Sequence, residues 1–366
     1  MKQSPIARLP EFGQSPWYDN LTRHYATGGL TGLIDRDGIR GVTSNPTIYE
    51  KALAAGNDYD EQLARCVTAG VDTKASYWDL VTTDVANAAD LLRPIYDSLD
   101  GADGFVSVEV DPDLAHNTAD TVKQAADLFS RLSKPNVMIK IPATEDCLPA
   151  IAQTIGAGIN VNVTLIFSLS RHAEVIEAYL SGLEQLAAKN GDLAKVNSVA
   201  SFFVSRVDTE TDRRLPDGHP LRGKAAVANA KLAYRLFERS FSGPRWEALA
   251  AKGARLQRPL WASTSTKNPA YSPTLYVDEL IGPHTVNTLA QASIDALQTH
   301  EGMRAGTVTE GLDEAEAAIA ALAGAGVDFD DVTDTLEREG VASFSASFHD
   351  ALDSLNKKAK ELGGSR

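Results

Sequence analysis

Strand-like and helix-like segments alternate from one end of this 366-residue chain to the other, and this alternation restricts its possible folds more than any other feature. Strands joined by helices pair in parallel, because each helical crossover brings the chain back to the same end of the sheet. The count of strand-like segments is consistent with eight, which closes a parallel sheet into a barrel. The chain length also lies in the usual range for such a barrel with extra helices.

We therefore predict the α/β fold class, as a single (β/α)8 TIM barrel with additional N- and C-terminal helices, in one domain over residues 1–366. Helical patterns at 312–322 and 341–355 predict a C-terminal helical cover over residues from about 307 to 366. The sequence leaves open whether this cover lies over the mouth of the barrel or at a subunit interface. Apolar spacing also predicts one long helical region from residue 59 to about 99.

The composition excludes several kinds of partner. A net charge of -14 argues against nucleic acid and anionic membranes, which need a basic surface. No run is long and apolar enough to span a bilayer, and residues 1–10 contain no apolar signal-peptide segment, so we expect a cytoplasmic protein. We expect a monomer or a homodimer. Cys66 and Cys147 lack metal-site spacing, and we expect both to be reduced and structural.

One lysine lies within an apolar strand-like segment. Residues 136–144 have the length and composition of a strand that is buried on both faces, and Lys140 lies among them. Burial disfavours the charged form of a lysine and favours the neutral amine, which can attack a carbonyl. Two other interpretations stay open, in which the side chain reaches water at the strand end or pairs with a carboxylate.

Polar side chains mark the ends of other strand-like segments, which is where barrel enzymes keep their functional groups. The candidates are Asp19, the turn at 43–46, Ser107, Glu109 and Asp111 on one face of 105–111, Asn160, Asn162 and Thr164 on one face of 158–168, Arg206 at the end of the strand predicted at 199–208, and the hydroxyl-rich loop at 263–267.

Each candidate also has an ordinary structural interpretation. These interpretations are a helix N-cap for Asp19 and for residues 43–46, a solvated edge strand for 105–111, an ion pair with Asp208 or Asp212 for Arg206, and a plain polar loop for 263–267.

No other kind of reactive group is indicated. No His, Cys and Asp residues have the ligand spacing of zinc, no glycine pattern is typical of a phosphate-binding or dinucleotide-binding loop, and no serine lies in a nucleophile elbow. An amine nucleophile remains, surrounded by carboxylates, hydroxyls, amides and two cations if the strand prediction is correct.

The motifs resemble those of the transaldolase family, in its longer bacterial subgroup, over nearly the whole chain. The matching motifs are residues 17–19, 41–46, 107–111, 137–144, 160–164, 200–206 and 261–263. The resemblance implies a class I aldolase barrel that moves a dihydroxyacetone unit between phosphorylated sugars of the pentose phosphate pathway. It also implies that no metal or organic cofactor takes part.

The resemblance further implies four catalytic roles. Lys140 attacks the ketose carbonyl of fructose 6-phosphate or sedoheptulose 7-phosphate and forms an imine. Asp19 takes a hydroxyl proton as the carbon–carbon bond breaks and returns it on condensation. Glu109 and Thr164 position a water for the proton transfers of imine formation and hydrolysis. These roles are chemically reasonable, because the iminium is an electron sink and two carboxylates in different settings can divide acid and base tasks.

The same resemblance implies a substrate-binding set. Asn45 and Ser201 hold hydroxyls of the dihydroxyacetone unit, with Thr43, Ser107 and Asn162 close by. Arg206 matches a phosphate ligand and Ser263 a neighbouring hydroxyl ligand. Shorter transaldolases have a second arginine just after that serine, whereas this chain has residues 264–267 there, and we assign Lys267 to the phosphate as the substitute.

Two other functions stay open from the sequence. One is an aldolase that cleaves fructose 6-phosphate and releases dihydroxyacetone, and the other is a non-catalytic sensor of sugar phosphates. The complete set of Lys140, Asp19, Glu109 and Thr164 argues against the sensor, since a binding protein has no need of the amine.

Overall fold

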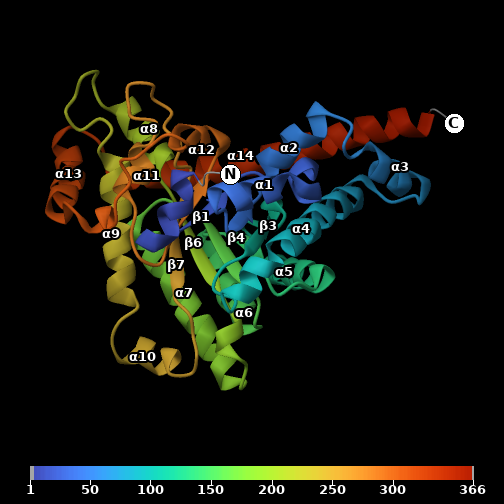
Figure 1. Ribbon diagram of the computed structural model, residues 1–366, viewed down its shortest axis with the longest axis horizontal. Helices are drawn as coiled ribbons and strands as arrows, with labels where there is room; N and C mark the ends of the chain where they lie inside the picture. The colour runs from blue at the N-terminus through green and yellow to red at the C-terminus, as the bar shows by residue number, and fades with distance from the viewer. Residues whose placement is uncertain (1–3, 365–366) are drawn as a thin grey trace.

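Eight parallel strands form a closed barrel in the computed structural model, which describes residues 4–364. Each strand pairs with the next one in the sequence, and β8 pairs with β1 (Figure 1). The predicted (β/α)8 barrel is therefore confirmed, while the ends of the predicted domain, 1–3 and 365–366, lie outside the described residues. The strands are β1 Gln14–Tyr18, β2 Gly41–Thr43, β3 Phe105–Glu109, β4 Val137–Pro142, β5 Val161–Ile166, β6 Ser198–Phe203, β7 Gln257–Ala262 and β8 Thr285–Leu289.

Helices surround this barrel. The α-helices are α1 Leu30–Asp37, α2 Pro46–Ala55, α3 Asp60–Thr68, α4 Thr73–Ser98, α5 Thr118–Leu132, α6 Leu148–Gly156, α7 Leu169–Ala188, α8 Ser205–Arg214, α9 Ala225–Ser240, α10 Pro244–Ala250, α11 Leu275–Glu279, α12 Gln291–Leu297, α13 Leu312–Gly324 and α14 Phe329–Gly364. A π-helix, η2 Tyr25–Gly29, precedes α1. The 3₁₀ helices are η1 Pro5–Phe12, η3 Pro112–Leu114, η4 Glu145–Cys147, η5 Leu193–Lys195 and η6 Thr307–Thr309.

Each strand has one face covered by helices and the other by the barrel interior. A strand that is buried on both faces must be mostly apolar, and these strands are. Every residue of β3, β4, β5 and β6 is buried, as expected of parallel strands. The register aligns Thr43 with Ser107, Glu109 with Lys140, and Lys140 with Asn162. Because parallel strands all point the same way, this register brings polar side chains from neighbouring strands together near one end of the barrel.

The last helix, α14, lies across that end of the barrel. It packs against α2 and α3 on one part of its length and against α8 on another, and it also contacts η3 and β5. These partners follow different strands, so the helix spans the barrel mouth and continues to the C-terminus as the long red helix of Figure 1. A side chain of α14 lines the cavity at the mouth, so this helix occupies one of the two positions that the sequence left open for the C-terminal cover.

The region from 59 to about 99 is helical over most of its length, as predicted, but the helix is interrupted. Two helices, α3 and α4, occupy this region, and they are separated at residues 69–72. Gly70 has a φ of +69°, in the left-handed region that glycine adopts readily. Asp72 then caps α4 by accepting a hydrogen bond from the Ala75 amide at 2.8 Å. A glycine and a capping aspartate therefore outweigh the continuous apolar spacing.

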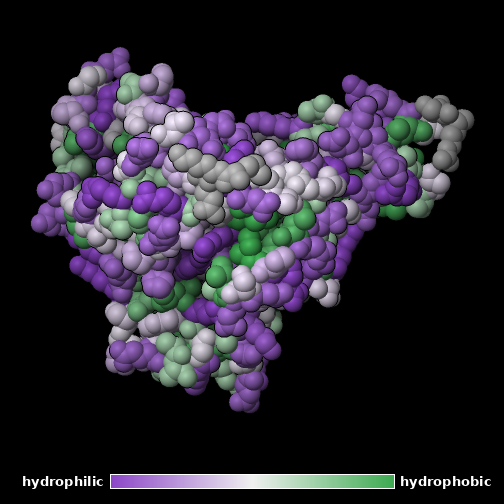
Figure 2. All heavy atoms as spheres, in the orientation of Figure 1, coloured by the Kyte–Doolittle hydropathy of each residue, from purple (hydrophilic) through white to green (hydrophobic). Residues whose placement is uncertain are grey.

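The surface in the view of Figure 2 is mostly hydrophilic, with one hydrophobic area near its centre. None of the helices within residues 4–364 has the length and apolar character that crossing a membrane requires. Cys66 and Cys147 are buried free thiols, and burial raises the pKa of both.

A stability prediction concerns Asp103, which is buried just before β3. Its carboxylate accepts hydrogen bonds from Ser15 and from Trp17 Nε1, the latter at 2.8 Å, and lies 3.5 Å from the Arg258 guanidinium. Asp103→Ala leaves these donors without their acceptor, so we expect the free energy of unfolding in urea to fall by about 3 kcal/mol. Asp97→Ala, which removes an exposed carboxylate paired with Arg93, is the control and should cost much less. Equal losses would contradict the role of Asp103.

A second prediction concerns His172 of α7, which is buried against Phe202 with ring centres 5.6 Å apart. Burial lowers the pKa of His172 from 6.5 to about 4. The unfolded chain therefore binds more protons than the folded protein in this window, and stability falls as the pH falls from about 6.5 towards about 4.

We expect His172→Leu to remove about 2 kcal/mol of the stability difference between about pH 7 and about pH 5 in urea unfolding. His116→Leu is the control, because His116 is exposed and pairs with Asp146 at the surface. The control should keep the pH dependence of the unmodified protein. A wild-type pH dependence in His172→Leu would show that this histidine is not the group responsible.

Candidate active site

A cavity of about 310 Å³ opens at the carboxyl ends of the strands. Nine of the residues proposed from the sequence line it, namely Asp19, Thr43, Asn45, Lys140, Thr164, Ser201, Arg206, Ser263 and Lys267. They come from or directly follow β1, β2, β4, β5, β6 and β7, so the barrel topology gathers side chains that are far apart in the sequence.

Lys140 of β4 reaches the cavity from a buried position, with only 5% of its surface exposed. Its Nζ donates to Glu109 Oε2 at 3.0 Å and to the Ser44 carbonyl at 3.3 Å. The pairing with a carboxylate that the sequence left open is thus present in this structure. Burial raises the pKa of Glu109, while the positive charge and hydrogen bond of Lys140 lower it and Asp19 raises it further. Glu109 is therefore suited to accept a proton from its neighbour.

Asp19, the carboxylate that lines the cavity, lies just after β1. Its backbone amide donates to the Leu289 carbonyl at 3.0 Å, and its side chain accepts a hydrogen bond from Thr43 Oγ1 at 2.7 Å. The first helical residue after β1 is Arg23, so Asp19 is not the helix N-cap that the sequence also allowed. A carboxylate fixed at both its backbone and its side chain is well placed to exchange a proton with a bound molecule.

Thr164 and Asn45 present further polar atoms to the cavity. Thr164 Oγ1 is buried and has no hydrogen-bond partner among residues 4–364. Burying a hydroxyl without a hydrogen bond costs free energy, unless a ligand or a water provides the missing partner. Asn45 Oδ1 accepts from the Ile48 amide at 3.0 Å and caps α2, so the cap and the cavity-lining interpretation both hold.

Ser107 and Asn162 are fully buried and do not line the cavity. Asn162 Nδ2 donates to Ser107 Oγ at 3.0 Å, and Ser201 Oγ donates to Asn162 Oδ1 at 2.7 Å. Ser201 is the member of this chain that reaches the cavity, so the other two fix its orientation.

Two polar residues on the predicted strand faces lie elsewhere. β3 ends at Glu109, and Asp111 caps η3 and pairs with Lys74. Asn160 precedes β5 and donates to the carbonyls of Pro135 and Val137. Alternating residues of an ideal strand share one face, which is why the sequence grouped these side chains. Asp111 and Asn160 lie beyond the ends of β3 and β5, so the alternation does not apply to them.

Arg206 is correctly assigned to the cavity but not to a strand. β6 ends at Phe203, and Arg206 lies in the first turn of α8. The alternative interpretation of Arg206, an ion pair with Asp208 or Asp212, does not hold among these described residues. Asp208 accepts hydrogen bonds from Tyr276 and the Ala226 amide, and Asp212 accepts them from Tyr271 and the Gly223 amide. Burial lowers the pKa of Arg206.

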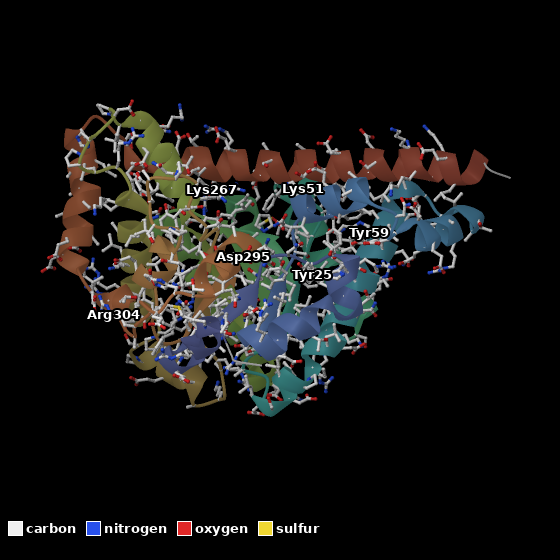
Figure 3. All side chains as sticks on the ribbon, turned by 45° about the horizontal axis from the view of Figure 1, so that its top comes forward. Tyr25, Lys51, Tyr59, Lys267, Asp295 and Arg304 are labelled. Carbon is white, nitrogen blue, oxygen red and sulfur yellow. The ribbon has the colours of Figure 1, made fainter. Side chains whose placement is uncertain are left out.

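Besides Lys140, three cationic side chains line the cavity. Lys267 Nζ donates to Ser265 Oγ at 2.9 Å, and the pKa of Lys267 is lowered by burial and then by the charge of Arg206. Lys51 of α2 is the third cation, and Figure 3 shows Lys51 and Lys267 close to α14. Ser263 contributes a hydroxyl that lies 2.9 Å from Ser205 Oγ. A cluster of cations and hydroxyls is suited to hold a phosphate.

The sequence analysis missed some residues of this cavity. Thr47, Ile48 and Lys51 all line it, at the helical spacing that puts side chains on one face of α2. The prediction of a helix starting at Pro46 could have identified them. Phe344 of α14 also lines the cavity, but no local pattern indicates this, because its place depends on how α14 crosses the barrel.

Taken together, the cavity is lined by an amine, a carboxylate, hydroxyls and a cationic wall. Glu109, the carboxylate that pairs with the amine, lies behind it and does not line the cavity itself. Within residues 4–364, no group of three or more His, Cys, Asp and Glu side chains is arranged to hold a metal ion. The arrangement can form and break a covalent bond between Lys140 and the carbonyl of an anionic ligand, with Glu109 and Asp19 to move protons.

Comparison with known proteins agrees with this chemistry. A family model described as Transaldolase/Fructose-6-phosphate aldolase matches residues 16–355. The chain is 50% identical to Transaldolase 1 of Streptomyces coelicolor, over 98% of this chain and 96% of that protein. It is 49% identical to a transaldolase of Acidothermus cellulolyticus, over 98% of this chain and 99% of that protein. The resemblance found in the motifs is confirmed, and the chain belongs to the transaldolase/fructose-6-phosphate aldolase family.

Proposed function

We propose that the chain is a transaldolase in which Lys140 carries the dihydroxyacetone unit as a Schiff base. The donor is sedoheptulose 7-phosphate or fructose 6-phosphate, and the acceptor is glyceraldehyde 3-phosphate or erythrose 4-phosphate. The observation that carries this proposal is the buried Lys140 amine, 3.0 Å from Glu109, in a cavity whose other groups include three cations. Proteins that are about half identical over their full length carry the name transaldolase, which supports the same function.

Glu109 begins the reaction by accepting a proton from Lys140. The neutral amine adds to the ketose carbonyl, and loss of water from the carbinolamine gives the iminium. Burial favours the protonated form of Glu109, as its raised pKa indicates, and this form can return the proton to the departing oxygen. Thr164, whose hydroxyl lacks a partner within the described chain, holds the water that exchanges these protons with Glu109.

Asp19 then acts on the carbon–carbon bond. It removes the proton of the hydroxyl next to the bond that breaks, and the bonding electrons move into the iminium to give an enamine on Lys140. The acceptor aldehyde reacts with this enamine, and Asp19 returns the proton to the new hydroxyl. Water then adds to the product iminium and the carbon–nitrogen bond breaks, which releases the new ketose and restores the Lys140 amine. The hydrogen bond from Thr43 holds the carboxylate of Asp19 in position for both steps.

The remaining residues bind the substrate. Asn45 and Ser201 hold the hydroxyls of the dihydroxyacetone unit, and Ser107 and Asn162 support Ser201 through their hydrogen bonds. Arg206, Ser263 and Lys267 bind the phosphate, with Lys267 in the role that a second arginine has in shorter transaldolases. Lys51 adds a cation to this subsite that the sequence analysis did not include.

One prediction from the proposed function tests the covalent intermediate. We expect borohydride reduction with fructose 6-phosphate to leave a dihydroxyacetone-sized adduct on Lys140, found by intact mass and peptide mapping. Lys140→Met should give no adduct and should lower kcat by at least about 10⁴-fold, because the covalent pathway is lost. Full activity of this variant would rule out the mechanism, and an adduct on a different lysine would reject the assignment of Lys140.

The same experiment separates the competing functions. Transfer to erythrose 4-phosphate that greatly exceeds the release of free dihydroxyacetone is expected of a transaldolase. Rapid release without an acceptor would favour the fructose 6-phosphate aldolase, which the family description also includes. Binding of phosphorylated sugars without any adduct would favour the non-catalytic sensor.

The next prediction tests the cationic wall. We expect Lys51→Met and Lys267→Met each to raise KM for fructose 6-phosphate by about tenfold with a small change in kcat, because a phosphate contact is made equally in the ground and transition states. Lys252→Met removes an exposed charge that does not line the cavity and serves as the control. If the control raises KM as much, the effect is one of net charge and the subsite assignment fails.

Three broader expectations from the sequence stay predictions. They are a single domain over residues 1–366, a cytoplasmic location, and a monomeric or homodimeric state.

A further inference from the structure

The C-terminal helix α14 contributes one aromatic side chain to the cavity. Phe344 is only 4% exposed, and the centre of its ring lies 5.4 Å from Lys140 Nζ. No other residue of α14 lines the cavity, among the described residues. Figures 1 and 3 show the long helix α14 that carries this residue. The 5.4 Å distance means that Phe344 lies on the side of the helix that faces the reactive amine.

Phe344 borders a second, much smaller space as well. This space of about 10 Å³ is lined by Glu109, Pro142, Leu165, Val341 and Phe344. A cavity needs a volume of roughly 10–15 Å³ to hold one water molecule, so this space is about the size of a single water. The ring therefore stands between the substrate cavity and a water-sized space that reaches Glu109.

Hydrogen bonds and an ion pair fix α14 on both sides of this ring. Ser345 Oγ donates to Asp113 Oδ1 at 2.7 Å, and Ser347 Oγ lies 2.8 Å from Thr47 Oγ1. Earlier along the helix, Glu337 pairs with Arg171 at 3.2 Å. The ring is thus held in place by contacts to helices that follow several different strands.

The barrel wall beneath α14 is shaped to meet it. Leu165 of β5 has a φ of +61°, a conformation that costs a leucine roughly 1–2 kcal/mol, and the register of β5 with β6 shifts at this point. A Cβ on Gly340 would lie only 3.0 Å from Leu165 Cδ2, so α14 approaches this leucine closely. Backbone strain that persists next to Thr164 and under Phe344 points to a functional constraint on this contact.

This arrangement bears on the fate of the three-carbon enamine. An acceptor aldehyde can take the fragment, or the enamine carbon can take a proton to give an iminium. Water then adds to the iminium carbon, and the carbon–nitrogen bond breaks, which releases dihydroxyacetone and restores the Lys140 amine. Both routes end with hydrolysis of an iminium, so they differ in what reaches the enamine carbon, an aldehyde in transfer and a proton delivered by water in release. An apolar ring offers no proton, and it offers water no hydrogen bond.

We propose that Phe344 is a specificity-determining residue that closes the cavity over the lysine-bound fragment and so favours transfer to a sugar phosphate over release of dihydroxyacetone. This proposal rests on the proposed function. The ring also faces the nitrogen that becomes positively charged in the iminium, which an aromatic face stabilises.

The test compares two rates in three variants. With fructose 6-phosphate alone, dihydroxyacetone release is measured, and with erythrose 4-phosphate added, transfer is measured. We expect Phe344→Ala to raise the ratio of release to transfer by about tenfold or more, because water gains access to the fragment. Phe344→Leu retains an apolar side chain of considerable volume and should change the ratio by less than about threefold.

Phe348→Leu is the matched control on the same helix. Phe348 is buried against Tyr77, with ring centres 5.0 Å apart, and does not line the cavity. This variant should lower the melting temperature and leave the ratio unchanged. A ratio that rises equally in Phe348→Leu and Phe344→Ala would attribute the effect to the stability of α14 and overturn the proposal.

Two further outcomes have distinct meanings. An unchanged ratio in Phe344→Ala, with the borohydride adduct still formed on Lys140, would reject the role of Phe344 and leave the proposed function in place. The absence of an adduct in the unmodified protein would reject the proposed function itself, and with it the inference that rests on it.

Discussion

The buried pair of Lys140 and Glu109 is the interaction on which the rest of this structure depends. The register of β3 with β4 puts the two residues side by side, and their charged atoms lie 3.0 Å apart. Two charges removed from water are costly unless each has a close partner, so neither group is tolerable there alone. The pair is therefore stable until a ketose binds. In the proposed mechanism, a proton then passes from Lys140 to Glu109, which neutralises both groups and frees the amine for reaction.

The surroundings of this pair are polar, but they are almost fully hydrogen-bonded. Ser107, Asn162 and Ser201 satisfy one another across β3, β5 and β6, and Thr43 satisfies Asp19. Such a network fixes side-chain positions, because each member loses a partner if its neighbour turns. Thr164 Oγ1 departs from this rule within the described residues, and it faces the cavity where a substrate or water would bind. Rigid groups and one unsatisfied hydroxyl together prepare the site for its ligand.

Most of the fold and much of the site could be predicted from the sequence, because both depend on local patterns. Apolar strands with polar ends are enough to identify Asp19, Lys140 and Thr164 as candidates. The errors arose where another local signal was stronger. Gly70 and Asp72 divide the helical region from 59 to 99, and the early end of β6 moves Arg206 into α8. Lys51 was missed although helical spacing from Pro46 could have revealed it.

By itself, the sequence determined the alternation of strands and helices, the eight-stranded barrel, the single lysine within an apolar strand, and the family to which the motifs belong. These depend on residue type and spacing over a few turns or strand positions. The tertiary structure alone decided that Lys140 pairs with Glu109, that Ser107 and Asn162 support Ser201, and that Phe344 of α14 lies over the Lys140 amine. The physical reason is that these contacts join segments far apart in the chain, and their geometry is set by strand register and by the path of α14 across the barrel.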